Sequence, residues 1–444
     1  MVASAAKVLQ LYCQTKMIKI PLQPTMPRWV ERMKPGHWYQ ISGDHPDLDL
    51  SPTPAGTRYL NDNDPANDIK INPPKGTKER LRRWLGRRPH APWQGRCGFP
   101  SITEGWNGGA FASRFGNSGS MIVFGGGHND YFGSDVHAFD LSTRQWSRIS
   151  DGYVSGGADE YGTGAVYPHA VYPDGSPLPP HTYGYVQYDS IGNDYLLLKG
   201  QLELGANVKA TPISHMFNLD SLKWRRGPKH PAAILSSGGW TTWDASRRIL
   251  WGHSGDNGNG FIGFTPDGDN DDGTFGSWTT HYPKKIQAAD HNTMAIDPVR
   301  DIIVVIVSAA SALYALDPSA PDREMVLLSS AGEQPKLSEY AALEYAPNLD
   351  RFVYFSAKNG AQLYTITAPA GSLWAQLTHG AWIWKSIISA DNRLDPIAHA
   401  GANSKYALNR EHTFGRFRVA TYGTLDVAVL VRHIDTPVYA MKLN

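Results

Sequence analysis

The sequence has little cysteine, no excess of either charge and no long apolar segment. Cys13 and Cys97 are the two cysteines among 444 residues, which excludes a disulfide framework and a cysteine-rich zinc site. With 42 Lys and Arg against 41 Asp and Glu, the net charge of +1 argues against a broadly basic nucleic-acid-binding protein and against an acidic disordered chain. No apolar run reaches the length of a transmembrane helix.

The N-terminal segment is also a poor match to a secretory signal. Its apolar patch, from Val8 to Cys13, is short and is flanked by lysines on both sides. We therefore expect synthesis in the cytoplasm without export by this route. Met1 and Met17 are both candidate start residues.

Glycine and aromatic residues are abundant instead. The chain contains 44 Gly, 14 Trp and 21 Tyr, and hydrophobic residues make up 41% of it. This composition is typical of many short strands joined by turns, with enough apolar surface for a large core. It predicts an all-β protein.

A unit of four short strand-like segments recurs along the chain. The clearest copy begins at Trp106, turns at Asn117-Ser-Gly, and ends at Trp146. Gly-Gly follows its second segment, and Phe139-Asp140 closes its third. Five further copies show the same order of segments, and they span residues 181–224, 238–278, 291–328, 339–382 and 412–442. Self-similarity of this kind indicates a repeat architecture.

The last copy lacks a fourth segment because the chain ends. Residues 37–42, with the sequence His-Trp-Tyr-Gln-Ile-Ser, have the character to supply it. Six four-stranded sheets closed by pairing the two chain ends form a β-propeller, and such closure leaves no long unpaired edge. In the fifth copy the fourth strand contains either Trp374 or Trp382.

Three segments of the first copy carry a family resemblance, namely Phe124-Gly-Gly-Gly127, Val136-His-Ala-Phe-Asp140 and Trp146. Through them the chain resembles the Kelch and galactose-oxidase-like β-propeller family over residues 106–444. The resemblance implies an all-β, Kelch-like propeller. Six blades fit the repeats best, and a divergent seventh blade within residues 43–105 or 378–411 is the alternative.

Residues 1–105 differ in composition from the repeats. Residues 1–36 are predicted to be an extended arm that crosses the propeller surface, and residues 43–105 an irregular segment with one short helix from near Thr77. The helix carries a basic patch formed by Arg80, Arg82, Arg83, Arg87 and Arg88. This patch indicates either contact with phosphate, sulfate or an acidic partner, or a solvated basic loop.

Histidines begin three of the six predicted innermost strands, at His181, His291 and His412. Because innermost strands surround the propeller axis, their first residues meet at one mouth of the central channel. Three converging imidazoles can ligate Zn or Cu, or act as acid–base groups. The alternative is that they bond to neighbouring blades and to ordered water in a wet channel.

A second group of polar and aromatic residues predicts a ligand-binding rim. Two of its histidines follow second strands, after Gly-Gly-Gly and after Trp-Gly. Such a rim suits a glycan, since sugar rings stack on aromatic faces while hydroxyls need both donors and acceptors. The group consists of His128, Asp130, Tyr131, Trp240, His253 and Tyr340.

The resemblance also implies enzymes as alternatives. Galactose oxidase and its relatives use copper and a Tyr–Cys thioether; Tyr183 has a suitable position, but Cys97 lies upstream of the first unit. Propeller polysaccharide lyases use His and Tyr to remove a proton beside a uronate, while a cation neutralises the carboxylate. His181, Tyr183, His128 and Arg416 would fill these roles, although no lyase-specific motif is present. The Gly-x-Ser-x-Gly motif of serine hydrolases is missing.

One acidic segment suits a hard cation. Residues 267–273 place oxygen-bearing side chains at alternating positions, as Ca²⁺ prefers, but they lack the Gly position and the closing Glu of an EF-hand. A solvated Asp/Gly turn is the alternative. No cofactor is required by the sequence; Zn, Cu and Ca are the metals that its patterns would admit.

The contrasting hypothesis is a binding or assembly module, which we favour because no complete catalytic motif is present. An arm of the composition of residues 1–36 frays unless a partner orders it. We therefore expect other protein subunits to bind through the arm, as in a virion of a phage, whose structural proteins need no secretory signal. An anionic glycan is a further expected partner, whereas a membrane span and sequence-specific nucleic-acid binding are not expected.

Overall fold

The fold is known from a computed structural model. It describes residues 24–42, 102–103, 106–125, 134–150, 171–172, 174–177, 179–198, 213–229, 239–253, 261–281, 292–397, 413, 415–432 and 437–444. Strands dominate these residues, and no described helix is long and apolar enough to cross a membrane. The expectation of an all-β protein is confirmed.

The strands form four sheets of four strands and one of eight. In three of the smaller sheets the strands follow chain order. The first consists of β2 (Gly109–Ala112), β3 (Ser120–Val123), β4 (Val136–Asp140) and β5 (Gln145–Ser150), and the second of β6 (Val186–Asp189), β7 (Asp194–Leu197), β8 (Ile213–Asn218) and β9 (Lys223–Lys229). The third consists of β10 (Trp240–Asp244), β11 (Ile249–His253), β12 (Phe261–Asp269) and β13 (Phe275–His281).

The eight-stranded sheet consists of two four-stranded halves joined through their last strands. Its order is β14 (Thr293–Asp297), β15 (Ile302–Val307), β16 (Ala312–Leu316), β17 (Val326–Gly332), β21 (Ala381–Ser386), β20 (Leu363–Thr367), β19 (Arg351–Phe355) and β18 (Ala342–Ala346). The joint is a parallel pairing of Ser329–Gly332 with Ala381–Trp384. Of the two tryptophans considered for the outer strand, Trp382 lies in β21, whereas Trp374 begins the short helix α7 (Trp374–His379).

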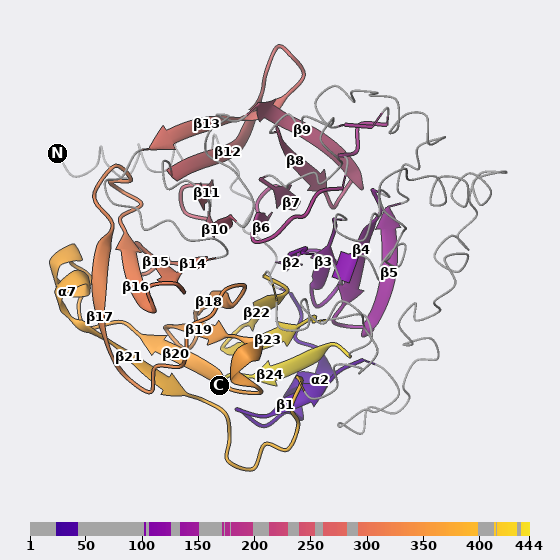
Figure 1. The fold of residues 1–444 in the computed structure, drawn as a ribbon. Coiled ribbons are helices and arrows are strands. Elements are labelled where there is room, and N and C mark those ends of the chain that lie inside the picture. Colours follow the sequence, from indigo (N-terminus) through magenta and orange to yellow (C-terminus); the bar gives the residue numbers. More distant parts are fainter. Residues whose placement is uncertain are drawn as a thin grey trace, which may run out of the picture.

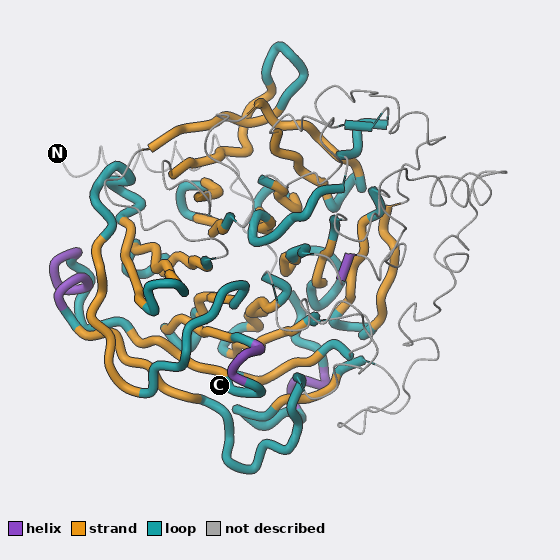
Figure 2. The backbone as a smooth tube through the Cα atoms, in the orientation of Figure 1, coloured by secondary structure: helices purple, strands orange, loops and turns teal. Residues whose placement is uncertain are grey.

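The first strands of these units stand in a closed ring. Strands β2, β6, β10, β14, β18 and β22 (Phe417–Tyr422) each contact the next, and β22 contacts β2. Figure 1 shows them around the centre of the molecule with the later strands further out, and Figure 2 shows that the helices of the described residues are short segments. The arrangement is that of a β-propeller.

The two ends of the described chain meet in the remaining sheet. It has the order β22, β23 (Leu425–Leu430), β24 (Tyr439–Lys442) and β1 (Trp38–Gln40), so a strand from the N-terminal region is its outermost member. Tyr39 lies opposite Ala440 in antiparallel register. The pairing that the sequence predicts for residues 37–42 is therefore present.

Residues 24–36 do not form the surface arm that the sequence predicts. Helix α2 (Arg28–Glu31) buries Trp29 and Val30 among residues of the first and last sheets, including Met121 and Val429. The indole Nε1 of Trp29 donates a hydrogen bond of 2.8 Å to the carbonyl of Leu141. Large apolar side chains at these positions explain the difference, because burying them is worth several kcal/mol (~3–5 for a Trp). Residues 1–23 of the predicted arm lie outside the described residues.

Tight turns connect the first and second strands of the units, and aspartates shape them. Asp189, Asp244 and Asp297 end β6, β10 and β14, and each accepts a hydrogen bond from a backbone N–H two residues ahead. Such side-chain caps favour turns over continued strands. The residue that closes each turn, for example Arg248 or Asp301, has a positive φ.

The same turns bond to one another around the ring. Arg248 pairs with Asp189 of the preceding unit, and Arg247 and Arg300 pair with Asp301 and Asp350 of the following ones. The remaining junctions are closed by hydrogen bonds from Arg114 to Ser190, from Asn348 to Asp426, and from Tyr422 to Ser118. Side chains on this end of the ring therefore link each sheet to its neighbours through ion pairs and hydrogen bonds.

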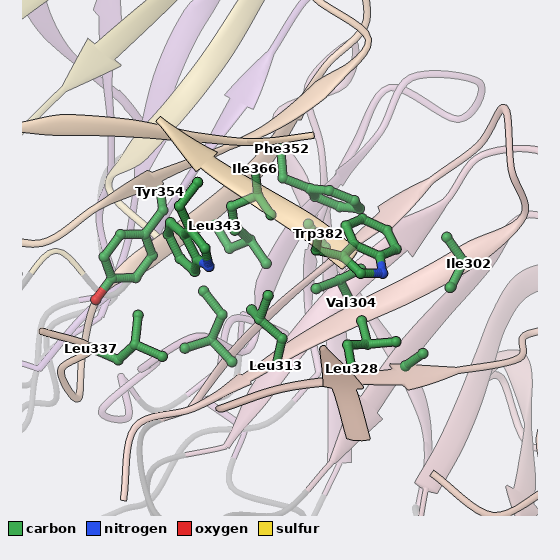
Figure 3. Packing of buried hydrophobic residues seen from close by; sticks show 14 of the residues in the cluster. Ile302, Val304, Leu313, Leu328, Leu337, Leu343, Phe352, Tyr354, Ile366 and Trp382 are labelled. Atoms are coloured by element: carbon green, nitrogen blue, oxygen red, sulfur yellow. The ribbon is translucent and has the colours of Figure 1, made fainter. Parts of the chain in front are cut away.

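Apolar cores fill the spaces between successive sheets. The core between the two halves of the eight-stranded sheet includes Val304, Leu313, Leu343 and Trp382. Figure 3 shows these side chains facing one another across the space between the strands. Strand β15 reads Ile-Ile-Val-Val-Ile-Val and is buried along its whole length, because a second strand has a neighbouring sheet on each face.

Candidate functional site

The axis of the ring is the place where residues from all units come together. The beginnings of the innermost strands line one cavity, which includes Tyr183, Trp240 and Tyr340 and is called the front mouth here. The ends of the same strands line a second cavity, which includes Phe111 and Trp243 and is called the rear cavity. The rear cavity has a volume of about 250 Å³, whereas the front cavity encloses about 30 Å³.

A charged network contributes to the lining of both cavities. The guanidinium of Arg418 in β22 bonds to Glu344 Oε1 of β18 at 2.5 Å and to Gln187 Oε1 of β6 at 3.2 Å. It also donates 2.8 Å hydrogen bonds to the carbonyls of Gly109 and Val186. One side chain of β22 thus bonds to residues of other units at the axis.

The position of Glu344 on the axis changes its acidity. Burial raises the pKa of the Glu344 carboxyl above its ordinary value of 4.5, and the nearby charge of Arg418 opposes this shift without cancelling it. The second carboxylate oxygen, Oε2, has no hydrogen-bond partner among the described residues, and the side chain is 22% exposed. Glu344 therefore presents an acceptor to the space around it.

Aromatic side chains gather at the front mouth. The ring of Trp106 lies 5.8 Å from His181, 5.7 Å from Tyr183 and 6.2 Å from Tyr340, measured between centroids. The backbone fixes this cluster, since the Tyr183 amide donates to the Trp106 carbonyl at 2.8 Å. Sequence positions far apart in the chain therefore form one aromatic cluster.

Two tyrosines of this cluster have unusual backbone conformations. Tyr183 has a φ of 42° and Tyr340 a φ of 61°, a region that bulky residues rarely adopt. The Tyr340 carbonyl accepts hydrogen bonds from the backbone amide and the hydroxyl of Thr413, which hold this conformation. Strain of about 1–3 kcal/mol per residue persists where the surroundings enforce it, and it concentrates at functional sites.

The structure brings His181 and Tyr183 together, as their predicted roles require. The Nδ1 atom of His181 lies 3.1 Å from the Tyr183 hydroxyl. His181 is fully buried and Tyr183 is 1% exposed. His128, His291 and His412 lie outside the described residues, so the three-histidine metal site stays a prediction. Within the described part of the chain, no group of three or more His, Cys, Asp or Glu side chains is placed to hold a metal ion.

The predicted rim residues Trp240 and Tyr340 line the front cavity together. His253 is stacked on Trp240, with ring centroids 4.7 Å apart, and is itself buried. It therefore supports the tryptophan ring rather than facing the cavity. Asp130 and Tyr131 lie outside the described residues.

Arg416 has a structural environment. Its guanidinium donates to the carbonyls of Asn107, Val431 and Arg432, and the side chain is 1% exposed. Burial, together with the neighbouring charge of Arg432, lowers the pKa of Arg416 to about 9. The carbonyl contacts connect β22 to the lead-in of β2, and the geometry gives no support to substrate contact by this side chain.

The other predicted sites can be placed only in part. Asp267 of the acidic segment pairs with Arg248, and Asp272 accepts hydrogen bonds from Thr274 within the β12–β13 turn. These contacts give the segment a structural use that needs no Ca²⁺. The basic patch and both cysteines lie outside the described residues.

Sequence reasoning missed the axial network. The sequence feature that could have revealed this network is a charged residue within an otherwise apolar strand. Glu344 lies in Ala-Leu-Glu-Tyr-Ala, and Arg418 lies in Phe-Arg-Val-Ala. Charged residues are rarely buried unless they are paired. The partner of each lies on another unit, so neither sequence position alone identifies the pair.

No known protein family and no curated protein matches the chain. A nidogen/laminin complex is similar at 11% identity and a TM-score of 0.35, covering 63% of this chain and 84% of the other. The Malassezia sympodialis allergen Mala s 1 is 11% identical, with a TM-score of 0.37 and coverages of 73% and 89%. A Bacteroides thetaiotaomicron protein of unknown function is 9% identical, with a TM-score of 0.40 and coverages of 74% and 68%. Similarity at this level supports no conclusion on function.

Proposed function

We propose that the chain is a six-bladed, Kelch-like β-propeller that acts as a binding or assembly module and takes its ligand at the front mouth. The closed ring of six innermost strands supports the blade number. The observation that carries the functional proposal is the convergence of Trp106, Tyr183 and Tyr340 at this mouth, two of them in strained backbone conformations. Unlike the turn residues with positive φ, these two tyrosines lie beside a cavity, and strained backbone tends to concentrate at binding sites.

A glycan is the ligand class that best suits the mouth. The half-buried Tyr340 provides aromatic surface, and Asn292 and Thr293 in the same cavity lining provide polar groups. Sugar recognition uses this combination of stacking and paired hydrogen bonds.

Calorimetric titration tests this proposal with a panel of neutral and anionic oligosaccharides, including cellohexaose, alginate and hyaluronan fragments. We expect at least one to bind, and Tyr340→Ala to weaken its affinity at least tenfold. The matched control is Tyr314→Ala, which removes a half-buried tyrosine from β16 far from the mouth. If no member binds, or both variants bind equally well, the glycan proposal is wrong.

Assembly through the N-terminal segment is a separate part of the proposal, and a virion is one setting for it. The structure shows where a truncation must stop: residues 24–42 belong to the propeller, so only residues 1–23 can be removed without cutting into its core. Sedimentation velocity of the full chain should reveal concentration-dependent self-association that the chain lacking residues 1–23 has lost. Identical monomeric behaviour of both chains, with equal melting temperatures, would contradict self-assembly through this segment.

A polysaccharide lyase is the second candidate, favoured by the contact between His181 Nδ1 and the Tyr183 hydroxyl. Incubation with alginate, hyaluronan and polygalacturonate should then generate unsaturated products that absorb in the ultraviolet. Tyr183→Phe should abolish this activity without lowering the melting temperature. Unchanged absorbance for every polymer rejects the lyase and leaves the binding module.

A further inference from the structure

The rear cavity is a second concave site, distinct from the front mouth. It lies where the innermost strands end, and its lining comes from all six of them. At about 250 Å³, it has room for about eight water molecules at ~30 Å³ each. A small organic molecule is therefore the size of ligand that it can hold.

The spare polar capacity of this cavity includes a carboxylate acceptor. The nitrogens of Arg418 are engaged with Gly109, Val186, Gln187 and Glu344, and the Gln187 amide nitrogen donates to Thr241. In the part of the chain that the structure describes, Glu344 Oε2 remains without a hydrogen bond. A ligand that donates hydrogen bonds or carries positive charge complements this oxygen, whereas an anion does not.

Aromatic rings form the walls around this acceptor. Phe111, Trp243 and Tyr345 line the cavity and are half-buried, so part of each ring remains accessible. The Tyr345 hydroxyl is already bonded to Asp350 at 2.6 Å, which turns its polar end toward the turn at the rim. Aromatic faces attract organic cations through the negative potential above the ring.

We propose that the rear cavity binds a small organic ammonium ion, with its charge directed at Glu344 and its alkyl groups against Phe111, Trp243 and Tyr345. The indole Nε1 of Trp243 is also without a hydrogen-bond partner in the described part of the chain, so the cavity offers one donor beside this acceptor. Burial already outweighs Arg418 in its effect on the Glu344 pKa, so a further positive charge at Oε2 compensates a carboxylate that remains poorly solvated. The proposal is independent of the ligand at the front mouth.

Titration calorimetry of the full chain with choline tests this proposal. The matched neutral probe is 3,3-dimethylbutan-1-ol, which has the shape of choline without its charge, and glucose is the polyhydroxyl probe. We expect choline to bind at least tenfold more tightly than either. Equal binding of the neutral isostere, binding of glucose in preference to choline, or no binding of choline would each overturn the proposal.

Variants locate the site. Glu344→Gln retains the shape and the hydrogen bond to Arg418 but removes the charge, and it should reduce choline affinity at least tenfold. Trp243→Phe should weaken binding severalfold while its melting temperature stays unchanged. This variant tests the location even if Glu344→Gln proves to be unstable. Trp278→Phe, in the outer strand β13, and Tyr314→Ala, in β16, should leave choline binding unchanged, since neither residue lines the cavity. Loss of binding in these two controls, or unchanged binding in Trp243→Phe, would contradict this location.

Discussion

Replacing Arg418 by Met should destabilise the propeller through its axis. The substitution preserves side-chain length but removes hydrogen bonds to Gly109, Val186, Gln187 and Glu344. Four bonds at ~1 kcal/mol each give about 4 kcal/mol, in agreement with the ~3–5 kcal/mol for breaking a buried ion pair on one side. Because Glu344 is 22% exposed, water offsets part of this loss, and we expect about 3 kcal/mol. Urea unfolding followed by tryptophan fluorescence measures the difference.

The pH dependence of this loss identifies its cause. The folded-state pKa of Glu344 is raised, so its contribution to stability is full below about 4.5 and declines as the pH rises through the folded pKa. Without Arg418 that pKa rises further, and the loss in the variant should be larger at pH 8 than at pH 5. Arg418→Met combined with Glu344→Gln should recover part of it. A loss below 1 kcal/mol, or one that neither pH nor the second substitution changes, would refute the reasoning.

Two other predictions concern the turns and the joint between sheets. Hydrogen bonding from Arg300 lowers the pKa of Asp350 to about 2, so the stability from this pair is present above pH 4 and lost as the pH falls toward 2; Arg300→Ala should flatten the melting temperature over that range. Gly332→Ala should lower the melting temperature more than Gly360→Ala. Both glycines have positive φ, but only a Cβ at Gly332 would meet a backbone atom, the Trp384 oxygen at 2.4 Å. The same fall in melting temperature between pH 4 and pH 2 with and without Arg300→Ala would contradict the first prediction. Equal losses of melting temperature in Gly332→Ala and Gly360→Ala would contradict the second.

The strands were predictable because the information for them is local. Runs such as Ile302–Val307 and turns such as the one after Asp297 specify strand and reversal within a few residues. The closing strand at residues 37–42 was predictable for a different reason, since an incomplete last unit demands a partner.

The axial network and the packing of the N-terminal segment depend on ring closure instead. Arg418 and Val186 are 232 positions apart, and their contact follows only once the units have closed around the axis. Trp29 likewise finds Leu141 across 112 positions. The prolines around residues 24–36 made this segment resemble a surface arm in composition. Burial of Trp29 instead fixes the segment against the propeller.

A designed cross-link tests the closed ring most directly. Tyr39 and Ala440 are direct partners in the β1–β24 pair, and such partners have Cα atoms about 4.5–5.5 Å apart, within reach of a disulfide. With Cys13 and Cys97 replaced by Ser, the chain carrying Tyr39→Cys and Ala440→Cys should form an intramolecular disulfide under mild oxidation, detected by peptide mass spectrometry. The control chain, with Tyr39→Cys and Tyr314→Cys, should not. Absence of the first link, or equal formation of both, would contradict a propeller closed by its two ends.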